Sequence, residues 1–370
     1  MKGLTLISLA TLLVVSVSAF FFAERKRDNT QEEDNNMREP NPKSEDIEVQ
    51  TAEYQVMAPV QQGNLQMFLI TGTEEIRNKQ YITLSEALID KKVIVKETGS
   101  VNELSIDNNS DDYVFIHSGD IVKGGKQDRT ISMDVIIPPK TKNIPLQSFC
   151  VEHNRWRKRG QEDVHSFSYN TKMLSSKELK LAAKYNKSQS EVWDNVAKQQ
   201  KDLDREVSEK NGYNTTVRDS RSASSLQLTL ENEELEKAKT DKEEAFKNVL
   251  ASNPQAIGFA YAINGEVYSI DIYNNRQLFE DMWDKLREAA ITESIAKDID
   301  QHHKLATIED VKQLMAQGPS TAKVDNMNLN QDTRLKTVEN GNDKLLFETE
   351  DVKQNNWIHR NYMKNEVSKR

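Results

Sequence analysis

Short runs of β-branched, aromatic and other apolar residues, separated by polar turns, fill the chain from residue 48 to residue 151. This spacing constrains the fold more than any other feature, because a strand has to end wherever a turn interrupts it. The runs lie at Glu48–Met57, Leu65–Thr71, Val93–Thr98, Val101–Ile106, Tyr113–His117, Ile131–Ile137 and Ile144–Val151. Strands at such short intervals predict an antiparallel β-sandwich or a barrel-like sheet core.

Further along the chain, the apolar residues recur at helical spacing, first over residues 192–207 and then over residues 226–250. A β-hairpin is predicted next, over Ala256–Tyr273, because its central Asn264-Gly265 suits a type I′ turn. A helix is expected directly after it. This order of elements predicts an α+β fold with a helical insertion and a C-terminal hairpin–helix unit.

The N-terminal end is expected to act in targeting rather than in the fold. Residues 4–22 are mostly apolar and include the small residues that a signal peptidase needs, which predicts a signal peptide over residues 1–23. The same run approaches the length that spans a bilayer, so an uncleaved membrane anchor is the alternative. The expected location is therefore periplasmic or extracellular, or else anchored to the inner membrane with residues 4–22 as the tether.

The other domain boundaries follow from polarity. Residues 24–50 contain almost no apolar side chains and predict a disordered linker. Residues 51–300 predict a single α+β domain, since apolar runs continue throughout them. Residues 301–370 predict a mostly polar tail, with a short helix over Ile308–Met315 and a strand over Leu345–Phe347.

Charge and cysteine content narrow the classes of partner and cofactor. A formal net charge of −9 argues against a nucleic-acid binder, which needs clustered cations to displace phosphate counterions. Cys150 is the only cysteine, so an intrachain disulfide is excluded. The sequence has no P-loop, nucleophile elbow or zinc-protease motif. Cys150 and His153 supply only half of a zinc site, so we predict neither a metal nor another cofactor.

Residues 113–159 join strand-like runs to two dense polar clusters, and we predict a ligand site there. The Gly124-Gly125 turn can expose backbone amides, and Lys126 adds a cationic donor for a phosphate or carboxylate group. Trp156 offers an aromatic face to a base or sugar. The predicted ligand-binding residues are Gly124, Gly125, Lys126, Gln127, Arg129, Arg155 and Trp156. The prediction requires Lys126 and Trp156 to converge in the fold.

Three residues are candidates for catalysis, and each has a plainer structural interpretation. Asp120 and Glu152 can act as an acid–base pair only if they face one another. Cys150 needs a depressed pKa to be a nucleophile, and otherwise it packs as a small apolar residue in its strand. The charged residues can equally lock strands together by buried hydrogen bonds.

Several motifs carry a resemblance to one protein family. They are Tyr81–Leu88, Gly119–Arg129, Cys150–Trp156, Ser190–Trp193 and the hairpin Ala256–Tyr273. Over residues 56–299 the chain resembles the ARG and rhodanese-phosphatase-superfamily-associated protein domain, a bacterial family. The family's name implies genomic association with ADP-ribosylglycohydrolases and phosphatase-like proteins, and hence a nucleotide-derived or phosphorylated ligand. The export-type leader and the long polar tail depart from the family's usual form. The extracytoplasmic location that the leader predicts argues against a role in intracellular ADP-ribose metabolism.

The expected function is that of a non-catalytic binding or scaffold module for an anionic, phosphate- or nucleotide-like ligand or for a protein partner. One alternative is a hydrolase of phosphorylated or glycosidic substrates that uses Asp120, Glu152 or Cys150. The other is that the polar motifs are purely structural. A carboxylate that faces the interior of a shared pocket favours the enzyme.

Overall fold

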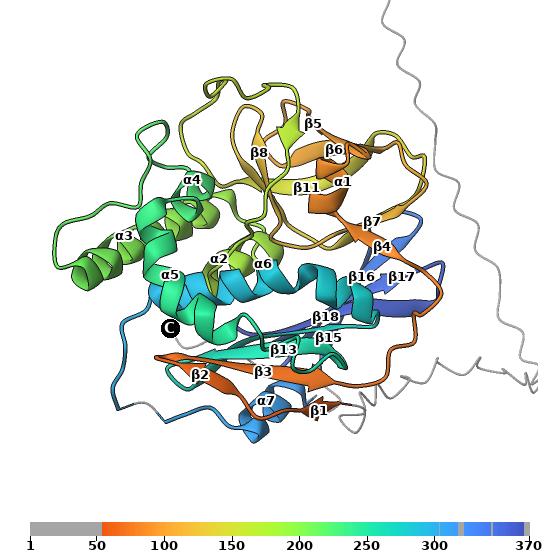
Figure 1. Cartoon of the computed structure of the whole chain (residues 1–370). Coiled ribbons are helices and arrows are strands. Elements are labelled where there is room, and N and C mark those ends of the chain that lie inside the picture. The colour runs from red at the N-terminus through yellow and green to blue at the C-terminus, as the bar shows by residue number, and fades with distance from the viewer. Residues whose placement is uncertain (1–53, 303, 317–321, 342, 366–370) are drawn as a thin grey trace, which may run out of the picture. The chain divides into compact units, whose positions relative to one another are not determined.

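The computed structural model describes residues 54–302, 304–316, 322–341 and 343–365, and within them the chain has the predicted α+β fold. Seven helices and three mostly antiparallel sheets make up these residues (Figure 1). The predicted leader over residues 1–23 and the predicted linker over residues 24–50 lie outside the described residues. Of the helices that the structure describes, none combines the length and apolar character that crossing a membrane requires.

The predicted hairpin forms the centre of the largest sheet, which has nine strands among the described residues. Its turn has positive φ at both Asn264 (50°) and Gly265 (76°), as a type I′ turn requires. The order across the sheet is β1 (Gln55–Val56), β3 (Leu65–Thr71), β13 (Ala256–Ile263), β14 (Glu266–Tyr273), β18 (Asn356–Lys364), β17 (Lys344–Asp351), β16 (Thr333–Asn340) and β15 (Lys323–Asn328), with β2 (Val60–Gln62) paired to β3.

Helices cover both faces of this sheet around the hairpin (Figure 1). Helix α6 (Arg276–Ile295) packs Phe279 and Met282 against one face of β3 and β13. Helix α7 (Ile308–Met315) packs Val311 and Leu314 against the other face. Because both faces are covered, every residue of β13 is buried. Helix α7 is the short helix predicted from the sequence over the same residues.

The prediction of a mostly polar tail beyond residue 300 with one strand is corrected by the structure. Four strands, β15 to β18, lie there, and the predicted strand Leu345–Phe347 is part of β17. Apolar residues lie on both faces of these strands, and one face also carries cross-strand ion pairs such as Lys336–Glu348 and Arg360–Glu348, which make the sequence look polar. Strand β15 at the edge is almost entirely exposed. The alternation of apolar and polar residues is weak in such strands, and pairing with neighbouring strands in the sheet stabilises them instead.

The strand-rich first part of the chain forms a six-stranded, barrel-like sheet. Its order is β12 (Phe167–Ser168), β8 (Ile121–Gly124), β9 (Arg129–Ile131), β11 (Ile144–Cys150), β6 (Glu103–Asn108) and β5 (Val93–Glu97). Its two edges meet at an antiparallel bridge between Lys96 and Ser166 and at a hydrogen bond from the Glu97 amide to the His165 carbonyl oxygen. Of the two predicted architectures, the barrel-like one is therefore observed.

A third sheet consists of β10 (Val135–Ile137), β7 (Tyr113–Ile116) and β4 (Tyr81–Thr83), with β4 parallel to β7. Helix α1 (Leu84–Ile89) follows β4. The sequence predicted one strand over residues 131–137, but residues 132–134 interrupt it, so that β9 and β10 belong to different sheets. The interruption leaves the side chain of Asp134 buried in the interior.

The predicted helical insertion lies between β12 and β13. It contains α2 (Lys177–Lys184), α3 (Gln189–Asn211), α4 (Leu226–Leu230) and α5 (Glu233–Phe246). Apolar residues of α2, α3 and α4 pack against Ile121 of β8 and Phe149 of β11. The insertion thereby supports the chain where it leaves β11.

Candidate functional site

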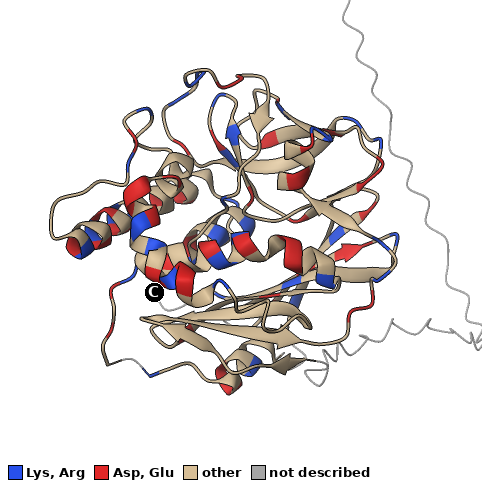
Figure 2. Ribbon diagram, in the orientation of Figure 1, with Lys and Arg blue, Asp and Glu red and all other residues tan. Residues whose placement is uncertain are grey.

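The segment between β11 and β12, residues 151–166 and here termed the β11–β12 loop, carries the cationic residues Arg155, Arg157, Lys158 and Arg159. Figure 2 shows Lys and Arg positions on the loops at the top of the view, where this segment lies. Its first residues are fixed to the helical insertion, since the Leu226 amide donates to the Val151 carbonyl oxygen at 3.0 Å. The loop therefore starts from a rigid base.

In the predicted Gly124-Gly125 turn, between β8 and β9, the backbone amides form hydrogen bonds within the fold and are not available to an anion. Gly124 and Gly125 have φ of +121° and +54°. The Gly124 amide donates to Asp128 Oδ1 at 3.0 Å, and the Gly125 amide donates to the Asp163 carbonyl oxygen at 3.0 Å. Their carbonyl oxygens accept hydrogen bonds from the Arg155 guanidinium at 3.0 and 3.1 Å. The turn thus positions the β11–β12 loop.

Two carboxylates and two arginines form a buried ion network under the loop, and each of these residues is at most 6% exposed. Arg159 binds Asp128 in a bidentate pair, with N–O distances of 2.7 and 2.8 Å. Arg155 donates to Glu152 at 2.6 Å. Glu152 also accepts from the Asp128 amide and from the Ser222 hydroxyl, at 3.0 and 2.5 Å. With its acceptors occupied in this way, Glu152 is poorly suited to act as a general base.

The other side of the turn is equally occupied. Arg129 is fully buried and donates to the Val101 carbonyl oxygen and, at 2.6 Å, to Cys150 Sγ. Gln127 donates to the Glu152 carbonyl oxygen at 2.9 Å. Burial raises the pKa of the Cys150 thiol to about 11, more than the Arg129 guanidinium lowers it. Cys150 is therefore a neutral, buried thiol at neutral pH and not an activated nucleophile.

Asp120 lies apart from the loop network. Its carboxylate pairs with Lys285 of α6 at 2.5 Å and accepts from the His117 amide at 3.0 Å. No hydrogen bond or ion pair within the described ranges joins it to Glu152. The structure does not bring the predicted acid–base pair together.

Lys126 and Trp156 do converge, as the sequence analysis required. The Lys126 ammonium lies 5.0 Å from the centre of the Trp156 ring, and the Arg129 guanidinium lies 5.5 Å from it. Both distances are those of cation–π contacts. Trp156 is 47% exposed, so the ring contacts cations while still facing solvent.

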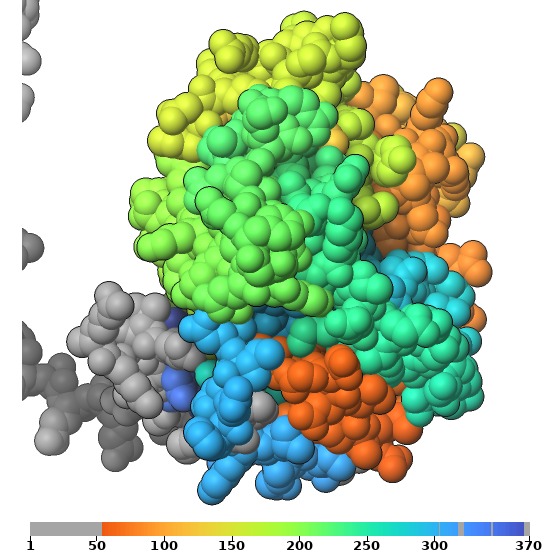
Figure 3. Space-filling model, turned by 60° about the vertical axis from the view of Figure 1, so that its left-hand side comes forward, coloured from red at the N-terminus to blue at the C-terminus, as the bar shows by residue number. Residues whose placement is uncertain are grey.

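The β11–β12 loop borders an open hollow of about 690 Å³, here termed the basic hollow. Figure 3 shows the loop region at the top of the turned view, next to the helical insertion. Arg157, Lys158 and Arg221 are the exposed cations that line the hollow. Arg221 is paired with the partly exposed Asp219 at 2.7 Å. No ion pair of the Arg157 or Lys158 side chain occurs within the described part of the chain.

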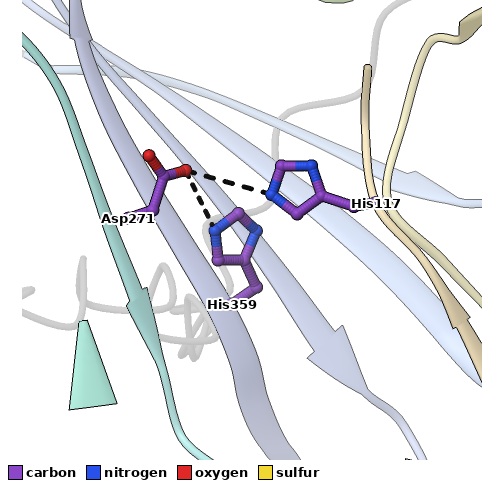
Figure 4. Close-up of side chains that lie close together, drawn as sticks. All are labelled: His117, Asp271 and His359. Carbon is purple, nitrogen blue, oxygen red and sulfur yellow. Dashed lines mark hydrogen bonds and ion pairs between the residues drawn. The ribbon is translucent and has the colours of Figure 1, made fainter. Parts of the chain in front are cut away.

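A second polar site, which the sequence analysis missed, contains residues that could hold a metal ion. His117, Asp271 and His359, here termed the histidine cluster, are buried with their ligand atoms all within 4.8 Å of one another (Figure 4). Burial lowers the pKa of His117 to about 4. Burial also acts to lower the pKa of His359, but Asp134 and Asp271 outweigh it and raise that pKa.

The signal for this cluster was weak in the sequence. The three residues are far apart in the chain, and the spacing of metal-ligand motifs is absent. What the sequence does show is Asp271 inside the otherwise apolar end of the hairpin. A carboxylate in a central, doubly covered strand needs buried partners, and this is the clue that could have been followed.

Comparison with known proteins identified one family. The family model of the ARG and Rhodanese-Phosphatase-superfamily-associated Protein domain matches residues 53–363. The match extends through β15–β18, beyond the residues over which the sequence motifs had suggested the resemblance. No curated protein and no solved structure matched the chain.

Proposed function

We propose a function for a chain that belongs to the ARG and Rhodanese-Phosphatase-superfamily-associated Protein domain family: it is a binding module that takes an anionic, phosphate-bearing ligand in the basic hollow. The observation that carries the proposal is the difference in burial among the cationic residues of the β11–β12 loop. Arg155 and Arg159 lie in the buried network, whereas Arg157 and Lys158, which lie between them in the sequence, are exposed at the basic hollow.

Electrostatics favour an anion at this place. Arg157, Lys158 and Arg221 lie on one open surface, and Glu162 is the only carboxylate residue among those that line the hollow. The Glu162 carboxylate is already paired with Arg159 at 2.9 Å. Guanidinium groups bind phosphate oxygens through paired, charge-assisted hydrogen bonds. A local positive surface on a chain of net charge −9 also concentrates the anion at one site.

Trp156 extends the proposal to ligands with a base or sugar. Its half-exposed ring lies on the same loop, next to Arg157. An aromatic face beside cationic donors suits a phosphorylated compound with a planar or sugar group, and this supports a nucleotide-like ligand.

The structural alternative is favoured for part of the predicted site. Gly124, Gly125, Gln127, Arg129 and Arg155 all donate or accept hydrogen bonds within the fold. We therefore assign these five residues to support, and Lys126 and Trp156 to the surface that meets the ligand. The three candidates of the hydrolase alternative all have structural partners or burial that argue against catalysis: Cys150 is a buried neutral thiol, Glu152 accepts hydrogen bonds from its neighbours, and Asp120 pairs with Lys285.

The location remains part of the proposal. The apolar residues 4–22 support export, with residues 1–23 removed or kept as an anchor. Cell fractionation with alkaline extraction tests it: release into the periplasmic or extracellular fraction supports cleavage, retention in the extracted membrane supports the anchor, and recovery in the cytosol contradicts both.

Calorimetric titration of the wild-type protein tests the binding function. Pyrophosphate, ADP and the uncharged nucleoside adenosine are compared at low and at high salt. We expect pyrophosphate and ADP to bind, ADP to bind more tightly, and the affinity of both to fall as salt rises, because screening weakens exposed charge pairs. Tighter binding of adenosine than of pyrophosphate, or no binding of either anion, would contradict the proposal. Release of phosphate from ADP would instead support the hydrolase.

A further inference from the structure

The histidine cluster combines residues from two sheets. His117 directly follows β7 of the three-stranded sheet, whereas Asp271 and His359 belong to the neighbouring strands β14 and β18 of the large sheet. In the antiparallel register, Tyr273 is paired with His359 and Asp271 with Asn361. Side chains alternate between faces along a strand, so Asp271 and His359 share one face of the large sheet.

The ligand atoms converge at a single point in the interior. His359 Nε2 lies 3.2 Å from Asp271 Oδ1, and His117 Nε2 lies 4.0 Å from the same oxygen (Figure 4). A four-coordinate Zn²⁺ with bonds of about 2.1 Å holds its ligand atoms roughly 3.4 Å apart. The first pair already fits this spacing. With the three ligand atoms up to 4.8 Å apart, the His117 ring has to move inward by up to about 1.4 Å.

Each imidazole is oriented by an oxygen atom at its other nitrogen. His117 Nδ1 lies 2.6 Å from the Ser118 carbonyl oxygen, which can only accept, so Nδ1 carries the proton and Nε2 presents a lone pair to the cluster. His359 Nδ1 lies 2.8 Å from Asp134 Oδ2. Asp134 is held in turn by the Ser118 amide at 2.7 Å and by the Thr349 hydroxyl at 2.8 Å. Metal-binding histidines are typically oriented in this way, through a carbonyl or carboxylate oxygen.

His117 Nε2 is a buried polar atom whose hydrogen-bond partner the described part of the protein does not supply. Without an ion, a protonated His359 can bridge Asp134 and Asp271, with Lys184 at 3.9 Å from Asp134 adding positive charge. That arrangement accounts for His359 and both carboxylates, but it leaves the lone pair of His117 aimed at a carboxylate. An electrophile between them removes the conflict.

From this geometry we propose that His117, Asp271 and His359 bind one divalent transition-metal ion, Zn²⁺ being the best match. Two imidazole nitrogens and one carboxylate oxygen are a donor set for zinc or a neighbouring transition metal, whereas Mg²⁺ and Ca²⁺ prefer oxygen alone. The fourth position is left to a water molecule. The ion ties β7 to the large sheet across the interior, so it stabilises the fold and does not depend on the function proposed for the basic hollow.

The test uses the full chain without a histidine tag, stripped with a chelator and then titrated with Zn²⁺. We expect one Zn²⁺ per chain by elemental analysis and a rise in melting temperature of about 5–10 °C at a hundredfold excess over the Kd. Co²⁺ in its place should give the visible absorption of a four-coordinate ion. Absence of stoichiometric metal, or of that absorption with bound Co²⁺, overturns the proposal.

Two substitutions locate the ion. His117→Gln should abolish both the stoichiometric binding and the thermal shift, whereas His302→Gln, which removes an exposed histidine, should leave both unchanged. If His117→Gln fails to fold, the conservative Asp271→Asn is measured for weakened Zn²⁺ affinity of at least tenfold. Wild-type binding in the folded variant, or loss of binding in His302→Gln instead, assigns the metal to the surface and contradicts the proposal.

Discussion

The β11–β12 loop and the histidine cluster both place charged groups in the interior, but they satisfy them differently. Under the loop, Asp128 and Glu152 face Arg155 and Arg159, and the short contacts among them pair each carboxylate with a guanidinium. In the histidine cluster, the imidazoles of His117 and His359 lie near Asp271, and His117 Nε2 has no hydrogen-bond partner among the described residues. A complete network supports a surface, whereas an incomplete one suggests that something from outside completes it.

In the β11–β12 loop, this difference distinguishes the residues that stabilise the fold from those proposed to contact a ligand. The buried arginines cannot reach a ligand without breaking pairs that cost about 3–5 kcal/mol to disrupt. Arg157 and Lys158 at the basic hollow have no ion pair within the described part of the chain, and the pair of Arg221 with Asp219 is exposed. Substitutions can test this comparison. They should change the free energy of unfolding strongly in the buried network and hardly at all among the exposed cations.

The largest effect is expected from Asp128→Asn, which removes one charge from the buried network while keeping the side chain's shape. We expect the free energy of unfolding to fall by about 3–5 kcal/mol, because Arg159 then stays buried without its bidentate carboxylate partner. Chemical denaturation followed by circular dichroism measures it. Asp219→Asn, which breaks the exposed pair with Arg221, is the matched control and should cost less than about 1 kcal/mol. Equal losses in the two variants would mean that the network is not the support.

A smaller effect, which depends on pH, is expected from Cys150. Its pKa is raised in the folded state to about 11 from an ordinary value of 9.0, chiefly by burial, so the folded chain holds the thiol proton longer than the unfolded chain does. The resulting stability is fully present below pH 9 and is lost as the pH rises towards 11. Relative to Cys150→Ala, the wild type should lose roughly 2–3 kcal/mol over this window. Parallel pH profiles of unfolding free energy for the two proteins would show that the thiol is not held in this way.

Gly125→Ala tests how closely the turn is packed. A Cβ atom at this position would lie 2.4 Å from the Phe167 ring, whereas at Gly160, which has the same φ of +54°, it would meet nothing within 4 Å. The alanine variants share the backbone strain, so their difference isolates the clash. We expect Gly125→Ala to be less stable than Gly160→Ala by about 1–3 kcal/mol in the same denaturation assay. A difference near zero would show that the turn and Phe167 separate freely.

Local patterns were enough to predict much of the fold. Asn264-Gly265 indicated the hairpin, because both residues accept positive φ, and α7 has the bounds Ile308–Met315 that the sequence predicted. Strands β15, β16 and β18, and most of β17, were missed because their stability comes from pairing with β14 and with one another, which no local pattern records. The missed break at residues 132–134 has the same origin, since a change of sheet is decided by tertiary packing.

The convergence of the Gly124-Gly125 turn and Trp156 could be predicted from the sequence, but the direction in which each arginine points could not. The sequence brought the diglycine turn and Trp156 together correctly, as the contact between Lys126 and Trp156 shows. It could not tell that Arg155 points inward and Arg157 outward, because neighbouring arginines look alike until the network of carboxylates is known. For the histidine cluster the sequence offered only the clue of Asp271 in a buried strand, since the three residues converge only when the segment after β7 meets the large sheet.

The most direct test of this division between support and contact is Arg157→Gln combined with Lys158→Gln. Pyrophosphate affinity and melting temperature are measured on the same samples, with Arg77→Gln combined with Lys201→Gln as a control of equal charge change at exposed positions elsewhere. We predict at least about tenfold weaker binding at an unchanged melting temperature, because the lost charges contact the ligand and not the fold. Equal affinity in the two double variants, or a loss of affinity that follows a loss of stability, would contradict the account.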